Sequence, residues 1–223
     1  MSNSLKQYLE KWNDIYIEKA KVLPIFKSEI TRNWNQNQKE YFVKVFYHVR
    51  GHFHDFLWYL GNHTDDKKVK DIILENISEE LNSSSLSHEQ LYEEFAKSLG
   101  VNLESEYLKE ENYRQEIRQF NNGHIKWLHN NCPNTGFAAF SAYERLDNID
   151  YINLLELAKN LGVTGKGLLF FKVHTRVEHF ETTYPKLKEI WDNDPQKVFS
   201  SFEFICNHQV KLWDDLEKII SQH

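Results

Sequence analysis

The sequence predicts an all-α fold, organised as one domain over residues 1–223. Only 8 Gly and 4 Pro occur among 223 residues. This is too few for a β-sandwich or barrel, which needs a turn roughly every 8–12 residues. Apolar side chains recur at helical spacing through nearly the whole chain. They make up 40% of the residues, which is enough for a packed core and excludes intrinsic disorder.

The expected helices follow in order from this spacing. Leu5, Leu9, Trp12 and Tyr16 form the apolar stripe of a first helix that ends before Pro24. Further helices are expected over about Gln36–Asn62, Lys67–Leu81, Ser87–Gly100, Asn112–Asn130, Gly136–Leu146, Asp150–Leu161, Gly167–Asp192 (bent near Pro185) and Pro195–Ser221. Ser87 and Gln90 have the spacing of a capping box, and the short connections are typical of a helical bundle.

Charge and composition exclude several classes of partner. The chain has 27 basic and 33 acidic residues, so no basic stripe for nucleic acid is expected. The segment MSNSLKQYLEKWND lacks the apolar core of a signal peptide, and no run approaches the ~20 apolar residues of a membrane span. Cys132 and Cys206 cannot form a disulfide framework. We therefore expect a cytoplasmic protein that binds neither membrane nor nucleic acid.

An acidic side chain falls on the apolar face of the helix expected over Lys67–Leu81. With each residue advancing about 100°, Glu80 lies about 20° from Ile73, among the apolar positions. Glu79 lies about 120° from Ile73, toward solvent. Because burial of an unpaired charge is costly, Glu80 is the carboxylate that needs a partner.

Two further residues fit the same interior. Glu144 shares one face of its segment with Phe137 and Phe140. His88 follows Glu80 by eight residues across a short polar loop, so the two side chains can converge.

The segment LLFFKVHTRVEHFE gives the strongest pattern. On a continuous helix, Glu178 and Glu181 lie within about 60° of His174, whereas His179 lies about 140° away. Three inward ionisable groups on two turns need a shared partner.

These residues together predict a metal site. The candidate ligands are Glu80, His88, Glu144, His174, Glu178 and Glu181. Carboxylates gathered in one core repel each other unless cations compensate them. Carboxylate and imidazole ligands projecting into a helical bundle are typical of di-iron or di-manganese sites. Each residue alone also fits an ordinary role, either a carboxylate paired with arginine or a hydrogen-bonded core histidine.

Other conspicuous residues have weaker signals. The segment YHVRGHFHDF contains His48, His52 and His54, but no HExxH motif, and we interpret them as a partly solvated group. Arg50 lies on the inner face, where it could anchor a substrate carboxylate or phosphate or form a structural ion pair. Nothing adjacent to Cys132 marks it as an activated nucleophile.

Four segments resemble the haem-oxygenase-like superfamily, specifically its TenA/PqqC-related branch. The stretch LPIFKSEITRNWNQNQKEYFVKVFYHVRGHFHDFLWYL is similar to the opening helices of that branch. ENISEELNSSSLSHEQLYEEFAKSLGV resembles its Asn-x-x-Glu-Glu…His stretch, AYERL its Tyr-Glu element, and FFKVHTRVEHFE its His-x-x-x-Asp-x-x-His helix. The resemblance covers nearly the whole chain and implies a haem-oxygenase-like helical bundle.

Within this superfamily, the haem-oxygenase-like diiron oxidases carry metal ligands at these motifs. The resemblance implies as ligands Glu80 (or Glu79), His88, Glu144, His174 and Glu178. The family's final histidine is Glu181 here, and His179 precedes it by two places. Either Glu181 ligates, or His179 is recruited, or the second metal position is weak or empty.

The resemblance further implies an O₂-dependent non-haem diiron oxidoreductase with two Fe(II) ions per chain. Its substrate would be a small carboxylate-bearing molecule, and we expect an amino acid, oxidised by N-oxygenation, C–C cleavage or nitrile formation. Arg50 is the expected substrate anchor, and a homodimer is expected from the resemblance alone.

Three alternatives remain: a TenA-like thiamin-salvage hydrolase, a PqqC-like oxidase, or a non-catalytic helical binding protein. The hydrolases use a cysteine just before the Tyr-Glu element, and Cys132 lies further upstream. The PqqC-like oxidases need no metal and would leave the carboxylates unexplained.

Overall fold

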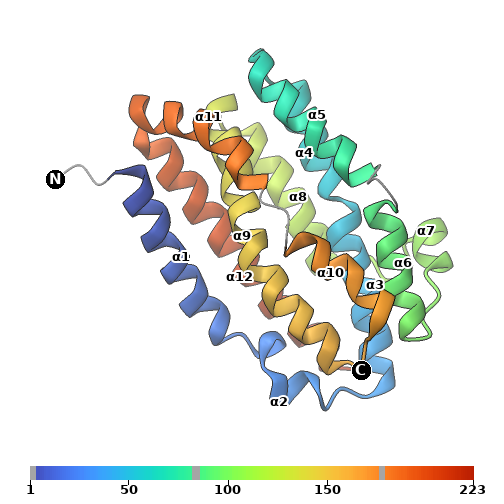
Figure 1. The fold of residues 1–223 in the computed structure, drawn as a ribbon. Helices are drawn as coiled ribbons and strands as arrows, with labels where there is room; N and C mark the ends of the chain where they lie inside the picture. The colour runs from blue at the N-terminus through green and yellow to red at the C-terminus, as the bar shows by residue number, and fades with distance from the viewer. Residues whose placement is uncertain (1–3, 82–85, 176–178) are drawn as a thin grey trace.

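The computed structural model describes residues 4–81, 86–175 and 179–223, without the side chain of residue 179, and every regular element in them is helical (Figure 1). The helices are α1 (Leu5–Lys21), α2 (Ser28–Thr31), α3 (Gln36–Gly51), α4 (Phe53–Asn62), α5 (Lys67–Leu81), α6 (His88–Ser98), α7 (Glu104–Lys109), α8 (Gln115–His129), α9 (Pro133–Asn160), α10 (Leu169–His174), α11 (His179–Asn193) and α12 (Pro195–Ile220), with 3₁₀ segments η1 (Pro24–Phe26) and η2 (Gly165–Leu168). The predicted all-α fold is confirmed.

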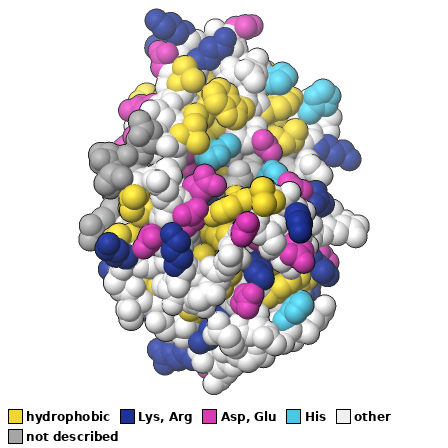
Figure 2. Space-filling view, turned by 90° about the vertical axis from the view of Figure 1, so that its right-hand side faces the viewer, with side chains coloured by type: hydrophobic (Ala, Val, Ile, Leu, Met, Phe, Trp, Pro, Cys, Tyr) yellow, Lys and Arg dark blue, Asp and Glu magenta, His cyan; other side chains and the backbone are white. Residues whose placement is uncertain are grey.

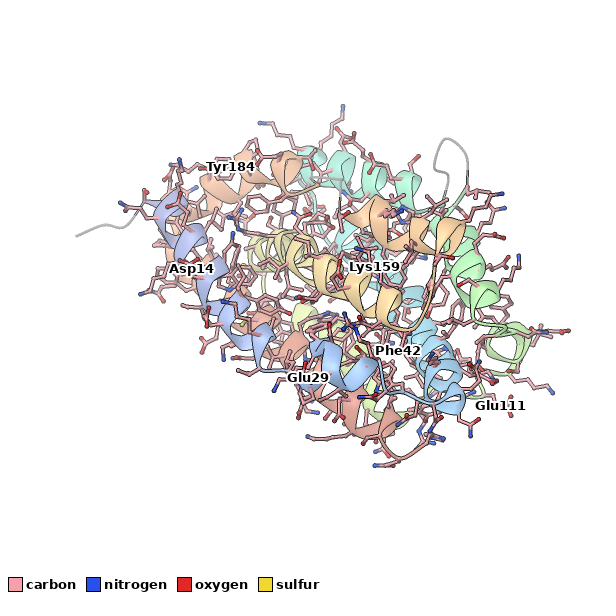
Figure 3. All side chains as sticks on the ribbon, turned by 60° about the horizontal axis from the view of Figure 1, so that its bottom comes forward. Asp14, Glu29, Phe42, Glu111, Lys159 and Tyr184 are labelled. Carbon is pink, nitrogen blue, oxygen red and sulfur yellow. The ribbon has the colours of Figure 1, made fainter. Side chains whose placement is uncertain are left out.

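Helices α9 and α12 pack against each other along the middle of the bundle, with α1 and α11 against them (Figure 1). Side chains such as Phe42 point into the interior, whereas Asp14 and Glu29 lie at the periphery (Figure 3). On the face shown in Figure 2, acidic and basic side chains are interspersed. In the described part of the chain, no helix is long and apolar enough to cross a bilayer.

The buried apolar side chains form two clusters, and α9 contributes to both. The first half of α9, up to Leu146, packs with α1, α4, α5 and α11. The second half, from Tyr151 onward, packs with α3, α6 and α10. Between them lie two acidic residues, the half-buried Asp147 and the buried Asp150. The polar middle of α9 therefore coincides with the boundary between the two apolar clusters.

The long helix predicted over Gln36–Asn62 is two helices, α3 and α4, which meet at His52. His52 has φ −89° and ψ 1°, outside the α-helical range, and it follows Gly51, a poor helix former. The ring Nδ1 of His52 lies 3.1 Å from a carboxylate oxygen of Asp55 in the first turn of α4. Because of this break, Arg50 and His54 line the same cavity from two different helices.

Two other predicted boundaries are wrong. The helices expected over Gly136–Leu146 and Asp150–Leu161 form one helix, α9, because no Gly or Pro occurs between them to end it. The helix expected over Gly167–Asp192 is interrupted after His174, whereas Pro185 lies inside α11. The short helix α7 was not predicted.

Candidate metal centre

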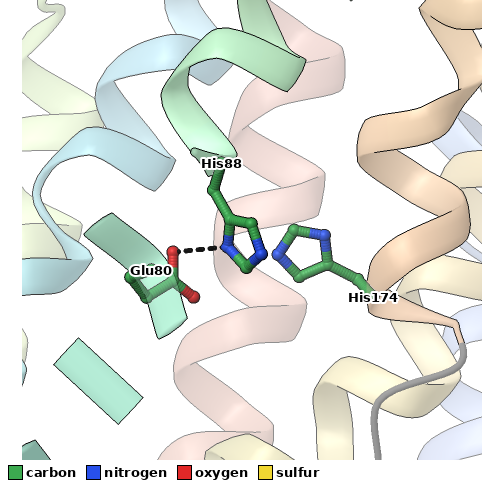
Figure 4. Close-up of side chains that lie close together, drawn as sticks. All are labelled: Glu80, His88 and His174. Atoms are coloured by element: carbon green, nitrogen blue, oxygen red, sulfur yellow. Dashed lines mark hydrogen bonds and ion pairs between the residues drawn. The ribbon is translucent and has the colours of Figure 1, made fainter. Parts of the chain in front are cut away.

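Glu80, His88 and His174 come together from three helices (Figure 4). One potential ligand atom from each of the three lies within 4.8 Å of the others. The Nδ1 atom of His88 lies 2.7 Å from Oε2 of Glu80, and the two imidazole centroids are 4.5 Å apart. The structure thus brings together three of the six predicted ligands.

Local sequence explains how Glu80 and His88 meet. Val69, Ile73 and Ile77 bury one face of α5, and Glu80 follows Ile77 by three residues, on the same side. Glu79 is exposed, so of these two acidic residues Glu80 faces the interior. The predicted capping box forms at the start of α6, where His88 is the first helical residue.

His174 has the hydrogen-bonding pattern of a metal-ligating imidazole. Its Nδ1 lies 2.7 Å from the carbonyl oxygen of Phe170, so Nδ1 carries the proton and donates it there. Its Nε2 is buried and has no hydrogen-bond partner among the described residues. Burial, helped by the positive charge of Arg50, lowers the pKa of His174 to about 3, so the imidazole is neutral. A buried neutral nitrogen with a free lone pair fits a bound metal ion.

Glu80 is ionised in this site. Burial by itself would raise its pKa, but the hydrogen bond with His88 and the charge of Arg50 outweigh burial and lower the pKa to about 2. One anionic oxygen donor therefore lies beside two imidazoles, a donor set suited to first-row transition metals.

Arg50 lies in the same cavity, which has a volume of about 110 Å³. Its Nη1 donates to the Tyr143 hydroxyl at 3.0 Å, and its Nη2 lies 3.6 Å from Asp147. The guanidinium also lies over the rings of Phe53 and Tyr151. The structure thus places the predicted substrate anchor beside the cluster, with part of its hydrogen-bonding capacity already used.

Glu144 is buried and Asp147 half-buried on α9, one turn apart. Burial and the negative charges of Asp147 and Glu80 raise the pKa of Glu144 well above its usual range. Burial likewise raises the pKa of Asp147 to about 6, opposed by Arg50. Glu144 was predicted, whereas Asp147 was missed, although its position three residues after Glu144 places it on the same helical face. Neither belongs to the close three-residue cluster.

Of the three histidines predicted to be partly solvated, His52 and His54 are partly exposed, whereas His48 is buried. His48 is buried and pairs with the buried Glu106 at 2.9 Å, while His52 pairs with Asp55. His54 was missed as a site residue: it lines the same cavity as the cluster, and its Nε2 lies 3.9 Å from Oε2 of Glu80. No signal in the sequence identifies it, because its position depends on the break at His52.

The structure does not bring Glu181 to the cluster. Glu181 is exposed in the first turn of α11, and its negative charge acts on Arg145. The prediction computed the angle between Glu181 and His174 around one continuous helix. Because α10 ends at His174, that angle does not apply to Glu181. Glu178 and the side chain of His179 lie outside the described residues.

Cys132 lies away from this cavity. It is exposed at the start of α9 and lines a different cavity, with Tyr59 and His129. Among the described residues, no cysteine lines the cavity of Glu80 and Arg50, which does not favour the alternative of a TenA-like hydrolase.

Comparisons with known proteins bear on this site. A model of the family described as iron-containing redox enzymes matches residues 40–180. Among solved structures, the chain is similar to a CADD-like protein of unknown function from Nostoc punctiforme, with 16% sequence identity and a TM-score of 0.73. That match covers 96% of this chain and 98% of the other, and at this identity it shows the fold alone. No match is found among curated proteins.

Proposed function

Because the chain belongs to the family of iron-containing redox enzymes, we propose that it is an O₂-dependent oxidase that holds iron at Glu80, His88 and His174. The family match and the similar bundle also confirm the predicted haem-oxygenase-like fold. The unpartnered, buried Nε2 of His174 carries the proposal, since it is a neutral donor directed at another imidazole beside an ionised carboxylate (Figure 4).

We propose about two Fe(II) ions per chain, as in the di-iron carboxylate proteins that are built on helical bundles. Glu80, His88 and His174 would hold the first. Glu144, and Glu178 from outside the described residues, would contribute to the second. Bound iron would supply the one-electron chemistry that O₂ activation requires, which amino-acid side chains alone do not provide. Glu181 is left out of this ligand set because it is exposed.

The side chains around the ligands have separate tasks. The Phe170 carbonyl accepts the Nδ1 proton of His174 and so fixes which nitrogen is free. Tyr151 stacks on the His174 ring at a centroid distance of 4.0 Å and excludes water from it. Arg50 offers a guanidinium at the cavity wall that can bind a substrate carboxylate. The expected homodimer and cytoplasmic location stay predictions.

Anaerobic loading with Fe(II) tests the proposed function. The wild-type chain is expected to retain about two irons after desalting and to consume O₂ on exposure to air. A chain that retains no iron and consumes no O₂ beyond a buffer blank would contradict the proposal. Hydrolysis of a thiamin pyrimidine without metal would instead favour the TenA-like alternative.

The proposed amino-acid substrate can be tested with Co(II) in place of iron. The visible spectrum of the Co(II)-loaded protein is expected to change on addition of at least one of the common amino acids, because a ligand in a cavity this small would alter the metal's surroundings. Arg50→Gln is expected to weaken that response at least tenfold by removing the charged bidentate donor. Lys166→Gln, on η2 and exposed, serves as the matched loss of positive charge. Equal responses in both variants would rule out Arg50 as the anchor.

A further inference from the structure

His54 is an imidazole beside the cluster that no recognised motif explains. It lies in the first turn of α4 and lines the cavity shared by Glu80, His88 and His174. About 32% of its side chain is exposed, but Nε2 is shielded from solvent and has no hydrogen-bond partner among the described residues. The nitrogen that faces the interior is therefore the one without a partner.

The distance from His54 to Glu80 suits a shared ion better than a hydrogen bond. Nε2 of His54 and Oε2 of Glu80 are 3.9 Å apart, beyond hydrogen-bonding range. Two ligand atoms that each lie about 2.1 Å from one metal ion can be separated by at most about 4.2 Å. One ion can therefore contact these two atoms as they stand, and His54, which lies outside the close three-residue cluster, would have to move toward His88 and His174 to share their ion. Oε2 also faces Nδ1 of His88, so the same carboxylate oxygen has an imidazole nitrogen on two sides.

The other two histidines of the α3–α4 region, His48 and His52, already pair with carboxylates and are weaker candidates for a further metal ligand. His48 is bound to Glu106, and Nδ1 of His52 faces Asp55. Glu181 stands where the related diiron oxidases have their last histidine, and it is exposed. A site built from the described residues is thus one imidazole short, and His54 is the described histidine whose unpartnered nitrogen faces Glu80.

We propose that His54 is a metal ligand of this site, adding through Nε2 a third imidazole to the ion held by Glu80, His88 and His174. The inference rests on the proposed function, because it requires that the cluster bind a metal at all. Three imidazoles and one carboxylate form a donor set for divalent first-row metals. In this donor set, His54 on α4 takes the place of the histidine that the related diiron oxidases have where this chain has Glu181, on α11.

Nuclear magnetic resonance of the chain with ¹⁵N-labelled histidine rings tests this assignment, with Zn(II) as a diamagnetic probe. The resonances of His54, His88 and His174 are identified by their loss in the three single alanine variants. On addition of Zn(II), the Nε2 resonance of His54 is expected to shift together with those of His88 and His174. His52, two residues before His54 and paired with Asp55, is the matched control whose resonances are expected to stay unchanged.

Zn(II) affinity gives a second readout. His54→Ala is expected to lose at least tenfold in affinity, and His63→Ala, which removes an exposed imidazole after α4, less than twofold. His54→Asn, which keeps a polar side chain, replaces the alanine variant if the latter melts at a much lower temperature. If the His54 resonance does not move while those of His88 and His174 shift, the assignment of His54 as a ligand is overturned, whereas the proposed function is not. If none of the three responds, the metal site and the proposed function both fail.

Discussion

His174→Ala is expected to lower Fe(II) affinity at least 100-fold, equivalent to about 2.7 kcal/mol of binding free energy. The substitution removes a neutral donor whose Nε2 is buried without a hydrogen-bond partner among the described residues, and whose tautomer is fixed by the Phe170 carbonyl. Anaerobic Fe(II) titration of the variant and the wild type measures the difference.

A matched control variant distinguishes the loss of a metal ligand from the loss of a histidine that does not bind metal. His63 is exposed after α4, and its Nδ1 contacts the Tyr59 carbonyl oxygen of the preceding turn, much as His174 contacts Phe170. His63→Ala is expected to bind Fe(II) like the wild type. Equal affinities in all three proteins would refute the assignment of His174 as a ligand.

Asp150→Ala is expected to lower the free energy of unfolding by about 2–6 kcal/mol, which would be the largest stability effect predicted here. The carboxyl of Asp150 accepts hydrogen bonds from the Tyr16 hydroxyl at 2.8 Å and from the Trp213 indole at 2.9 Å. Alanine leaves both buried donors unpaired, each at a cost of about 1–3 kcal/mol. Chemical denaturation of the two proteins at one pH measures the loss.

Asp150→Asn provides the control and adds a test of pH dependence. Burial raises the pKa of Asp150 to about 7, opposed by the hydrogen bonds from Tyr16 and Trp213. The unfolded chain releases this proton near pH 4. Between about pH 4 and 7 the native state thus binds more protons, so this group's contribution to stability falls as pH rises, by at most about 1.4 kcal/mol per pH unit.

Asparagine has no such proton and keeps the size and polarity of the side chain. The advantage of the wild type over Asp150→Asn is therefore expected to shrink as pH rises from 4 to 7. Parallel stability profiles over that range would contradict the raised pKa of Asp150.

The all-α architecture could be predicted because apolar spacing and the shortage of Gly and Pro both act locally along the chain. Helices whose ends carry a local signal, such as the capping box at Ser87, were placed well. The break at His52 and the continuity of α9 were not. The first depends on how His52 contacts Asp55, and the second on the absence of any residue that would end the helix.

The candidate site was predictable where one helical face decides the direction of a side chain. Glu80 lies on the buried side of α5 as its phase predicted, and His88 follows across a short loop. The phase argument failed for Glu181, because it assumed a helix that the structure interrupts after His174. His54 and its approach to Glu80 depend on how α4 packs against α5, which no periodicity within either helix reveals.

Anomalous diffraction at the iron edge, from crystals loaded anaerobically with Fe(II), tests the metal centre most directly. The expected result is an anomalous peak within bonding distance of the Glu80 carboxylate and of ring nitrogens of His88 and His174. A peak elsewhere in the molecule, or none at these three residues in a crystal that retains iron, would contradict the proposed centre.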